Sequence, residues 1–132
     1  MTKEERIEYC KQRIELAHST FDAAKLLIEN GYYNSAINRL YYSIFYVVSA
    51  LLVLNEIDSQ THSGLRSQFS QHYIKTNILD KKYGKLLVQL YDWRQQGDYD
   101  SLCDFSKKTL LELIEPINEM LYVVENEINK TI

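Results

Sequence analysis

Proline, glycine and cysteine are scarce in this chain of 132 residues, which contains one proline, four glycines and two cysteines. Sandwiches and barrels need frequent turn residues between their short strands, so the composition argues against both. Cys10 and Cys103 lie far apart and form no set with the spacing of zinc ligands, so we expect two free thiols. The scarcity of these three residues therefore favours long helices without a disulfide framework.

A strongly basic composition and a membrane-length apolar run are also missing. The net charge of −3 and the isoelectric point of about 5.6 argue against a protein that tracks nucleic-acid phosphates over a broad surface. The longest uncharged apolar run, residues 40–54, is shorter than the roughly 20 residues that span a bilayer. The charged segment MTKEERIEY lacks the apolar core of a signal peptide. We expect a cytoplasmic protein that does not bind membranes.

Apolar residues recur at steps of three and four, which predicts four long helices and one short helix. The first helix starts after a capping box formed by Thr2 and Glu5 and ends at Gly31, a residue that tolerates a left-handed cap. The others are expected at about residues 33–55, 61–74 (the short one) and 81–96, and from a start between 104 and 109 to about 129. Residues 97–100 should break the fourth helix, and Pro116 should kink the last. We predict an all-α, up-and-down bundle that forms one domain over residues 1–132.

The helix predicted at residues 33–55 is apolar or aromatic almost all round, yet it carries one charge, Arg39. Five of the eleven tyrosines lie near this arginine: Tyr32, Tyr33, Tyr41, Tyr42 and Tyr46. A helix without a solvated face must be covered on more than one side. A buried guanidinium needs a partner, so the identity of that partner is the central question for function.

A second arginine segment ends the fourth predicted helix and places Arg94, Asp98 and Tyr99 within six residues. One reading is purely structural: Arg94 pairs with Asp98 at i,i+4 while Tyr99 packs over the helix break. The other reading places this segment beside Arg39 in a shared groove. Asp98 is then a candidate partner for either arginine.

The chain resembles the HEPN family (higher eukaryotes and prokaryotes nucleotide-binding domain) in its small prokaryotic branch. The matching segments are GYY at residues 31–33, RLYYSIF at 39–45, THSG at 61–64 and RQQGDY at 94–99. They follow one another in order over nearly the whole chain. The resemblance implies a paired-helix bundle that is usually a homodimer and is often encoded beside a minimal nucleotidyltransferase.

The resemblance also implies an activity, because many family members are metal-independent ribonucleases or toxins. Those members carry an arginine followed, after four to six residues, by a histidine near a dimer groove. In this chain neither Arg39 nor Arg94 is followed by a histidine at that spacing. Arg66 and His72 match it, and random placement of five arginines and three histidines gives such a match about one time in three.

We therefore expect a HEPN-type module that binds a nucleotide, RNA or a partner nucleotidyltransferase, in a toxin–antitoxin-like system. The expected groove residues are Arg39, Tyr42, Arg94, Asp98 and Tyr99, since arginine makes forked phosphate contacts and tyrosine stacks on bases. Arg94 and Tyr99 are the candidates for catalysis, and Tyr99 is a candidate for modification by the transferase. No metal and no cofactor are expected. The alternatives are an active ribonuclease toxin with a non-standard residue set, and a structural helical dimer.

Overall fold

The computed structural model describes residues 1–99 and 105–132, without the side chain of Tyr99. Every regular element in these ranges is helical, which confirms the all-α prediction. In chain order the elements are α1 (Lys3–Glu29), α2 (Tyr33–Leu54), α3 (His62–Phe69), the π-helix η1 (Ser70–Ile74), α4 (Lys81–Tyr99) and α5 (Lys107–Asn129).

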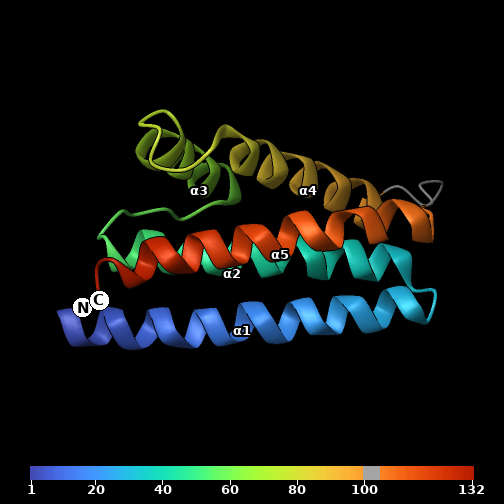
Figure 1. Ribbon diagram of the computed structural model, residues 1–132, viewed down its shortest axis with the longest axis horizontal. Helices are drawn as coiled ribbons and strands as arrows, with labels where there is room; N and C mark the ends of the chain where they lie inside the picture. The colour runs from blue at the N-terminus through green and yellow to red at the C-terminus, as the bar shows by residue number, and fades with distance from the viewer. Residues whose placement is uncertain (100–104) are drawn as a thin grey trace.

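The α2 helix is the centre of the bundle. It packs against α1, α3, α4 and α5, with α1 on one side and the α3 and α4 segment on the other (Figure 1). The chain enters and leaves the molecule at the same end, so the two termini lie close together in Figure 1. The turn between α1 and α2 lies at the opposite end.

The α1–α2 hairpin forms as its caps predict. The Thr2 hydroxyl accepts a hydrogen bond from the Glu5 amide, and the Glu5 carboxylate accepts one from the Thr2 amide, both at 3.1 Å. After α1, Gly31 has a φ of 82°, a left-handed conformation that costs glycine little. The first two helices of the chain are therefore joined antiparallel by a tight turn.

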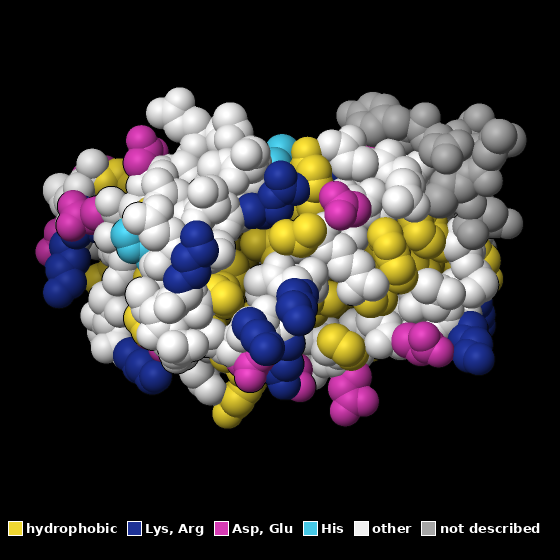
Figure 2. Space-filling model, turned by 90° about the horizontal axis from the view of Figure 1, so that it is seen from above, with side chains coloured by type: hydrophobic (Ala, Val, Ile, Leu, Met, Phe, Trp, Pro, Cys, Tyr) yellow, Lys and Arg dark blue, Asp and Glu magenta, His cyan; other side chains and the backbone are white. Residues whose placement is uncertain are grey.

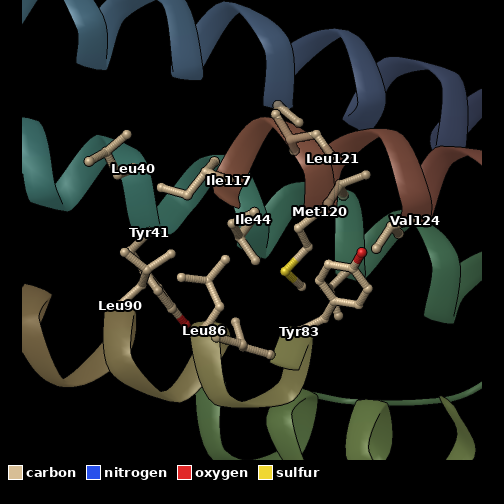
Figure 3. Packing of buried hydrophobic residues seen from close by; sticks show 14 of the residues in the cluster. Leu40, Tyr41, Ile44, Tyr83, Leu86, Leu90, Ile117, Met120, Leu121 and Val124 are labelled. Carbon is tan, nitrogen blue, oxygen red and sulfur yellow. The ribbon is translucent and has the colours of Figure 1, made fainter. Parts of the chain in front are cut away.

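The core lies where α2, α4 and α5 meet (Figure 3). Ile44 of α2, Leu90 of α4 and Met120 of α5 are fully buried there. The apolar stripe predicted for residues 33–55 is buried along its length from Ile37 to Leu51. The opposite stripe, which contains Arg39, is only partly buried.

By length and composition α2 could cross a membrane, but 67% of its most apolar window is buried inside the bundle. The core helix of a folded domain has the same length and composition. Burial of α2 by its neighbouring helices accounts for its unusual hydropathy.

One predicted boundary was wrong, and one predicted helix differs in type. Residues 97–99 do not break the fourth helix, because α4 continues through Gly97 to Tyr99. A side chain at Gly97 would lie 3.0 Å from Cγ2 of Ile37 and 3.4 Å from the ring of Phe105, so the glycine allows close packing instead of ending the helix. The short helix spans nearly its predicted range, but its last five residues, Ser70–Ile74, form the π-helix η1.

Candidate functional site

Arg94 is the buried cation of the bundle, with 9% of its surface exposed. Its Nη1 donates to the hydroxyl of Tyr42 at 3.1 Å and lies 3.7 Å from a carboxylate oxygen of Asp98. Its Cζ atom lies 5.4–5.6 Å from the ring centroids of Tyr41, Tyr42 and Tyr91. Nε is buried without a hydrogen-bond partner among the described residues. Aromatic faces and one phenol therefore hold a guanidinium whose carboxylate partner is distant.

Arg39 and Arg94 lie beside the same ring, as the shared-groove reading predicts. The Cζ atoms of Arg39 and Arg94 are 5.1 and 5.5 Å from the ring centroid of Tyr42. Arg39 donates two hydrogen bonds to Oδ1 of Asn38, and Nδ2 of Asn38 donates to Asp98 at 3.2 Å. Asp98 thus contacts Arg94 directly and Arg39 through Asn38.

The expectation that Arg39 is a buried charge was wrong. Arg39 is only partly buried, because its stripe of α2 faces outward, whereas Arg94 of α4 is buried against the tyrosines of α2. The structure therefore brings together four of the five predicted groove residues: Arg39, Tyr42, Arg94 and Asp98. Tyr99 ends α4, but its side chain lies outside the described residues, as do residues 100 and 101.

Arg66 and His72 match the family spacing along the chain, but no contact joins their side chains in the described structure. The Cζ atom of Arg66 lies 4.0 Å from the ring centroid of Tyr91. His72 is exposed on η1. Arg66 therefore joins the aromatic group around Arg94 without His72.

His62 belongs to this group and was missed as a site residue. It is the first residue of α3, and its Nδ1 lies 2.7 Å from the hydroxyl of Tyr41. Its ring centroid is 5.0 Å from that of Phe45 and 5.8 Å from that of Tyr91. The THSG segment was the available signal, but 31 residues separate His62 from Arg94 and no spacing along one helix connects them.

The environment keeps the side chains of His62 and Tyr41 uncharged at neutral pH. Burial lowers the pKa of His62, and the positive charges of Arg94 and Arg66 lower it further. Burial likewise raises the pKa of the Tyr41 hydroxyl well above its usual range. A neutral imidazole and a neutral phenol therefore lie beside two permanent cations.

The surface next to this cluster is basic and partly apolar. A groove of about 680 Å³ between α4 and the α3–η1 segment is lined by Arg66, Lys81, Lys85 and Trp93, among others. Figure 2 shows this side of the molecule, where Lys and Arg side chains are interspersed with hydrophobic ones. An overall acidic protein thus presents a local surface suited to an anion with an aromatic or apolar part.

No group of three potential metal ligands occurs within the described ranges. His18 pairs with Glu125 of α5, and Asp22 pairs with Lys25. Cys10 is a buried free thiol whose pKa is raised to about 11 by burial; Cys103 lies outside the described residues. Arginine, tyrosine and histidine are therefore the chemically useful groups of the site.

Comparison with known families gives one decisive match, between the model of the HEPN domain and residues 10–127. The chain belongs to the HEPN family. A UPF0332 protein of Thermotoga maritima is 36% identical over 93% of this chain and 91% of its own length. A Methanocaldococcus jannaschii protein named "Putative toxin MJ0142" is 38% identical over 72% of this chain and 65% of its own length. A second protein of that organism, named "Putative toxin MJ0605", is 33% identical over 65% and 64%.

The resemblance seen in the sequence is thus confirmed as family membership. The HEPN fold explains why the segments RLYYSIF and RQQGDY meet, since α2 and α4 pack directly against each other. The family match does not determine which side chains form the site in this chain. Within the described ranges, the site consists of an arginine–tyrosine cluster, the nearby carboxylate of Asp98 and a histidine from α3.

Proposed function

We propose that this HEPN protein binds RNA or a nucleotide through the phosphate groups, with Arg94 as the central contact. The observation that supports this most directly is the state of Arg94, a buried guanidinium that has, among the described residues, an unpartnered Nε and no carboxylate closer than 3.7 Å. Arg39 and Arg66 lie against rings of the same cluster. A phosphate supplies the charge and the acceptor atoms that this group lacks.

The structural alternative, in which Arg94 only holds the bundle together, is less well supported. A buried structural arginine is expected to be hydrogen-bonded to a carboxylate, because an unpaired buried charge is costly. Asp98 lies beyond hydrogen-bond distance from Arg94, and 29% of its side chain is exposed. The aromatic faces around Arg94 stabilise the cation without accepting conventional hydrogen bonds from its N–H groups.

The biological setting is part of the same proposal. Relatives named as putative toxins support a toxin-like role for this chain. We propose that it acts in the cytoplasm, and the family resemblance is the ground for proposing a nucleotidyltransferase partner. We propose that it acts as a homodimer, as the family resemblance implies. Exposed apolar side chains on α4 and α5, such as Val88 and Leu111, are consistent with such a contact.

The test is RNA binding by the full chain, measured as fluorescence anisotropy of a labelled single-stranded RNA. Arg94→Met should weaken binding about 10- to 100-fold, because hydrogen bonds to a charged group contribute about 1.5–3 kcal/mol. Lys130→Met is the matched control, since Lys130 pairs with Glu127 near the C-terminus and carries the same charge. Wild-type affinity should also fall steeply with salt.

Two results would contradict the proposal. One is the absence of RNA and nucleotide binding by the wild-type protein. The other is a loss of binding in Arg94→Met that is explained by unfolding, with a stability loss on the order of 3–5 kcal/mol, as expected when a buried ion pair is broken. Circular dichroism and urea unfolding of each variant separate these cases.

A further inference from the structure

The groove of about 680 Å³ between α4 and the α3–η1 segment, the α4–η1 groove, follows α4 over most of its length. Lys81 and Gln96, which both line it, lie about 22 Å apart along α4 at a rise of about 1.5 Å per residue. Arg66, Phe69 and Ile74 line the facing wall. Two helical walls of this length accommodate about four turns of a third helix.

We propose that the α4–η1 groove is a docking site for an acidic amphipathic helix of a partner protein, and that this partner competes with RNA. The competition rests on the proposed function, since it requires RNA at the arginine cluster. The docking itself does not, and it is measured without RNA.

The floor of the groove is apolar. Phe69 and Leu87 line the groove and are each only 1% exposed, so they form its base. Val88, the next residue of α4, is 46% exposed and presents apolar surface to solvent. α4 and η1 are in contact at Gly84, where an added Cβ would lie 3.3 Å from Cγ1 of Ile74. Apolar side chains at steps of three and four on an incoming helix match a floor of this kind.

The polar lining of the groove is mainly cationic. Arg66, Lys81 and Lys85 line it, and in the described part of the chain none of them forms an ion pair with a carboxylate. The neighbouring Lys82, which does not line the groove, is paired with a glutamate of α5 at 2.7 Å. Asp92 is the one acid among the described lining residues. Three cations and one acid favour a helix whose polar face is acidic.

The lining also distinguishes a protein helix from RNA. Single-stranded RNA binds where successive exposed rings allow successive bases to stack. The aromatic residues among the described lining are Phe69 and Trp93, and Phe69 is buried. Rings with an arginine beside them lie instead in the cluster, at Tyr42 and Tyr91. An apolar groove with cations and without a row of rings therefore favours an acidic protein helix.

Arg66 connects the groove to the arginine cluster. Its Cζ atom lies 4.0 Å from the ring centroid of Tyr91, and Cζ of Arg94 lies 5.6 Å from the same centroid. A carboxylate of the partner that pairs with Arg66 neutralises one cation of the cluster and brings a negative charge towards Arg94. The partner and RNA therefore weaken each other's binding by the same factor.

A displayed library of helices of about 16 residues tests the chemistry of the ligand. The library carries Leu, Ile or Phe at steps of three and four, and Glu, Gln or Lys at the other positions. Selection on the full-length protein should enrich Glu next to the apolar positions. Enrichment of Lys, or the absence of any enriched helix, overturns the inference.

The position of the enriched peptide is tested by the fluorescence of Trp93, the single tryptophan of the chain, during a titration. Val88→Glu should weaken binding at least about tenfold, because it places a carboxylate in the apolar contact. Leu26→Glu is the matched control, since Leu26 is 62% exposed and α1 lies on the other side of α2 (Figure 1). Equal affinities of Val88→Glu and the wild type overturn the inference. So does a wild-type dimer that Val88→Glu converts to a monomer in light scattering, because a second copy then fills the groove.

The competition is measured as anisotropy of labelled single-stranded RNA. Saturating peptide should weaken RNA binding by about fivefold or more, as coupled sites typically do. In Arg66→Gln the peptide should no longer change the RNA affinity, while the Trp93 signal of docking persists. A peptide that docks on the wild type without changing its RNA affinity overturns the competition. A wild-type protein that docks the peptide and binds no RNA overturns the proposed function and leaves the docking site standing.

Discussion

The hydroxyl of Tyr41 lies 2.7 Å from Nδ1 of His62, so a residue of the central helix holds the ring of a residue at the start of α3. This bond connects the segment outside the α1–α2 hairpin to the core. It also couples the stability of α3 to the chemistry of the site, and the first two predictions depend on it.

Tyr41→Phe should destabilise the protein by about 1 kcal/mol, because a net intramolecular hydrogen bond is lost while the buried ring is kept. Urea unfolding followed by circular dichroism measures the change. Tyr122→Phe is the control, since Tyr122 is 65% exposed and its substitution should change the free energy of unfolding by a few tenths of a kcal/mol. Equal effects of the two substitutions would show that the Tyr41–His62 bond contributes nothing.

His62 should make the protein less stable as the pH falls. Its folded-state pKa is lowered, so the unfolded chain takes up a proton near pH 6.5 while the folded chain resists protonation until lower pH. The free energy of unfolding should therefore decrease from about pH 6.5 down to the folded-state pKa. Urea unfolding over this range should show a shallower pH dependence in His62→Asn, and identical slopes would contradict the assignment.

Asp98→Asn should strengthen RNA binding by about two- to fivefold. The Asp98 carboxylate competes with a bound phosphate for Arg94, and the amide that replaces it carries no charge. Anisotropy with the labelled RNA gives the affinity, and Glu127→Gln, which removes a carboxylate paired with Lys130, is the charge-matched control. Weaker binding by Asp98→Asn would mean that the carboxylate positions Arg94 for its ligand.

Gly97→Ala should destabilise the fold by about 1–3 kcal/mol, although alanine is the better helix former. The added Cβ would lie 3.0 Å from Cγ2 of buried Ile37, so α4 must move away from α2. Thermal unfolding measures the loss. An increase in melting temperature would show that the end of α4 adjusts to the added methyl group without a loss of stability.

Cys10 should resist thiol reagents in the folded protein. Burial raises its pKa to about 11, so little thiolate exists at pH 8 and the sulfur is shielded from solvent. A Cys103→Ser variant isolates Cys10, and its reaction with a disulfide reagent should become rapid only in denaturant. Rapid labelling without denaturant would indicate local opening of α1.

The helices with strong apolar periodicity were predicted well. α1, α2 and α5 end within about two residues of their expected limits because buried apolar residues recur at steps of three and four along each of them. The end of α4 was wrong, because the sequence shows Gly97 as a break and cannot show that Ile37 and Phe105 pack against it. The π-helical turn at residues 70–74 also has no periodic signal in the sequence.

The candidate site was predictable only along individual helices. The sequence identifies Arg39 with Tyr42, and Arg94 with Asp98, because each pair lies three or four residues apart on one helix. Which arginine is buried depends on how α4 packs on α2, and periodicity does not contain that information. His62 joins the site across a gap of 31 residues, so its role is visible only in three dimensions.

The two chain ends lie together, at the opposite end of the bundle from the turn at Gly31, towards which Arg39 and Arg94 are placed in their helices (Figure 1). A tag, fluorophore or surface linker on either terminus is therefore kept away from Arg39 and Arg94. A flexible linker that is long enough to reach from one copy to another can join two copies into one chain. A tandem chain of this kind, with Arg94→Met in one half only, would show whether the two copies contribute to RNA binding separately or together.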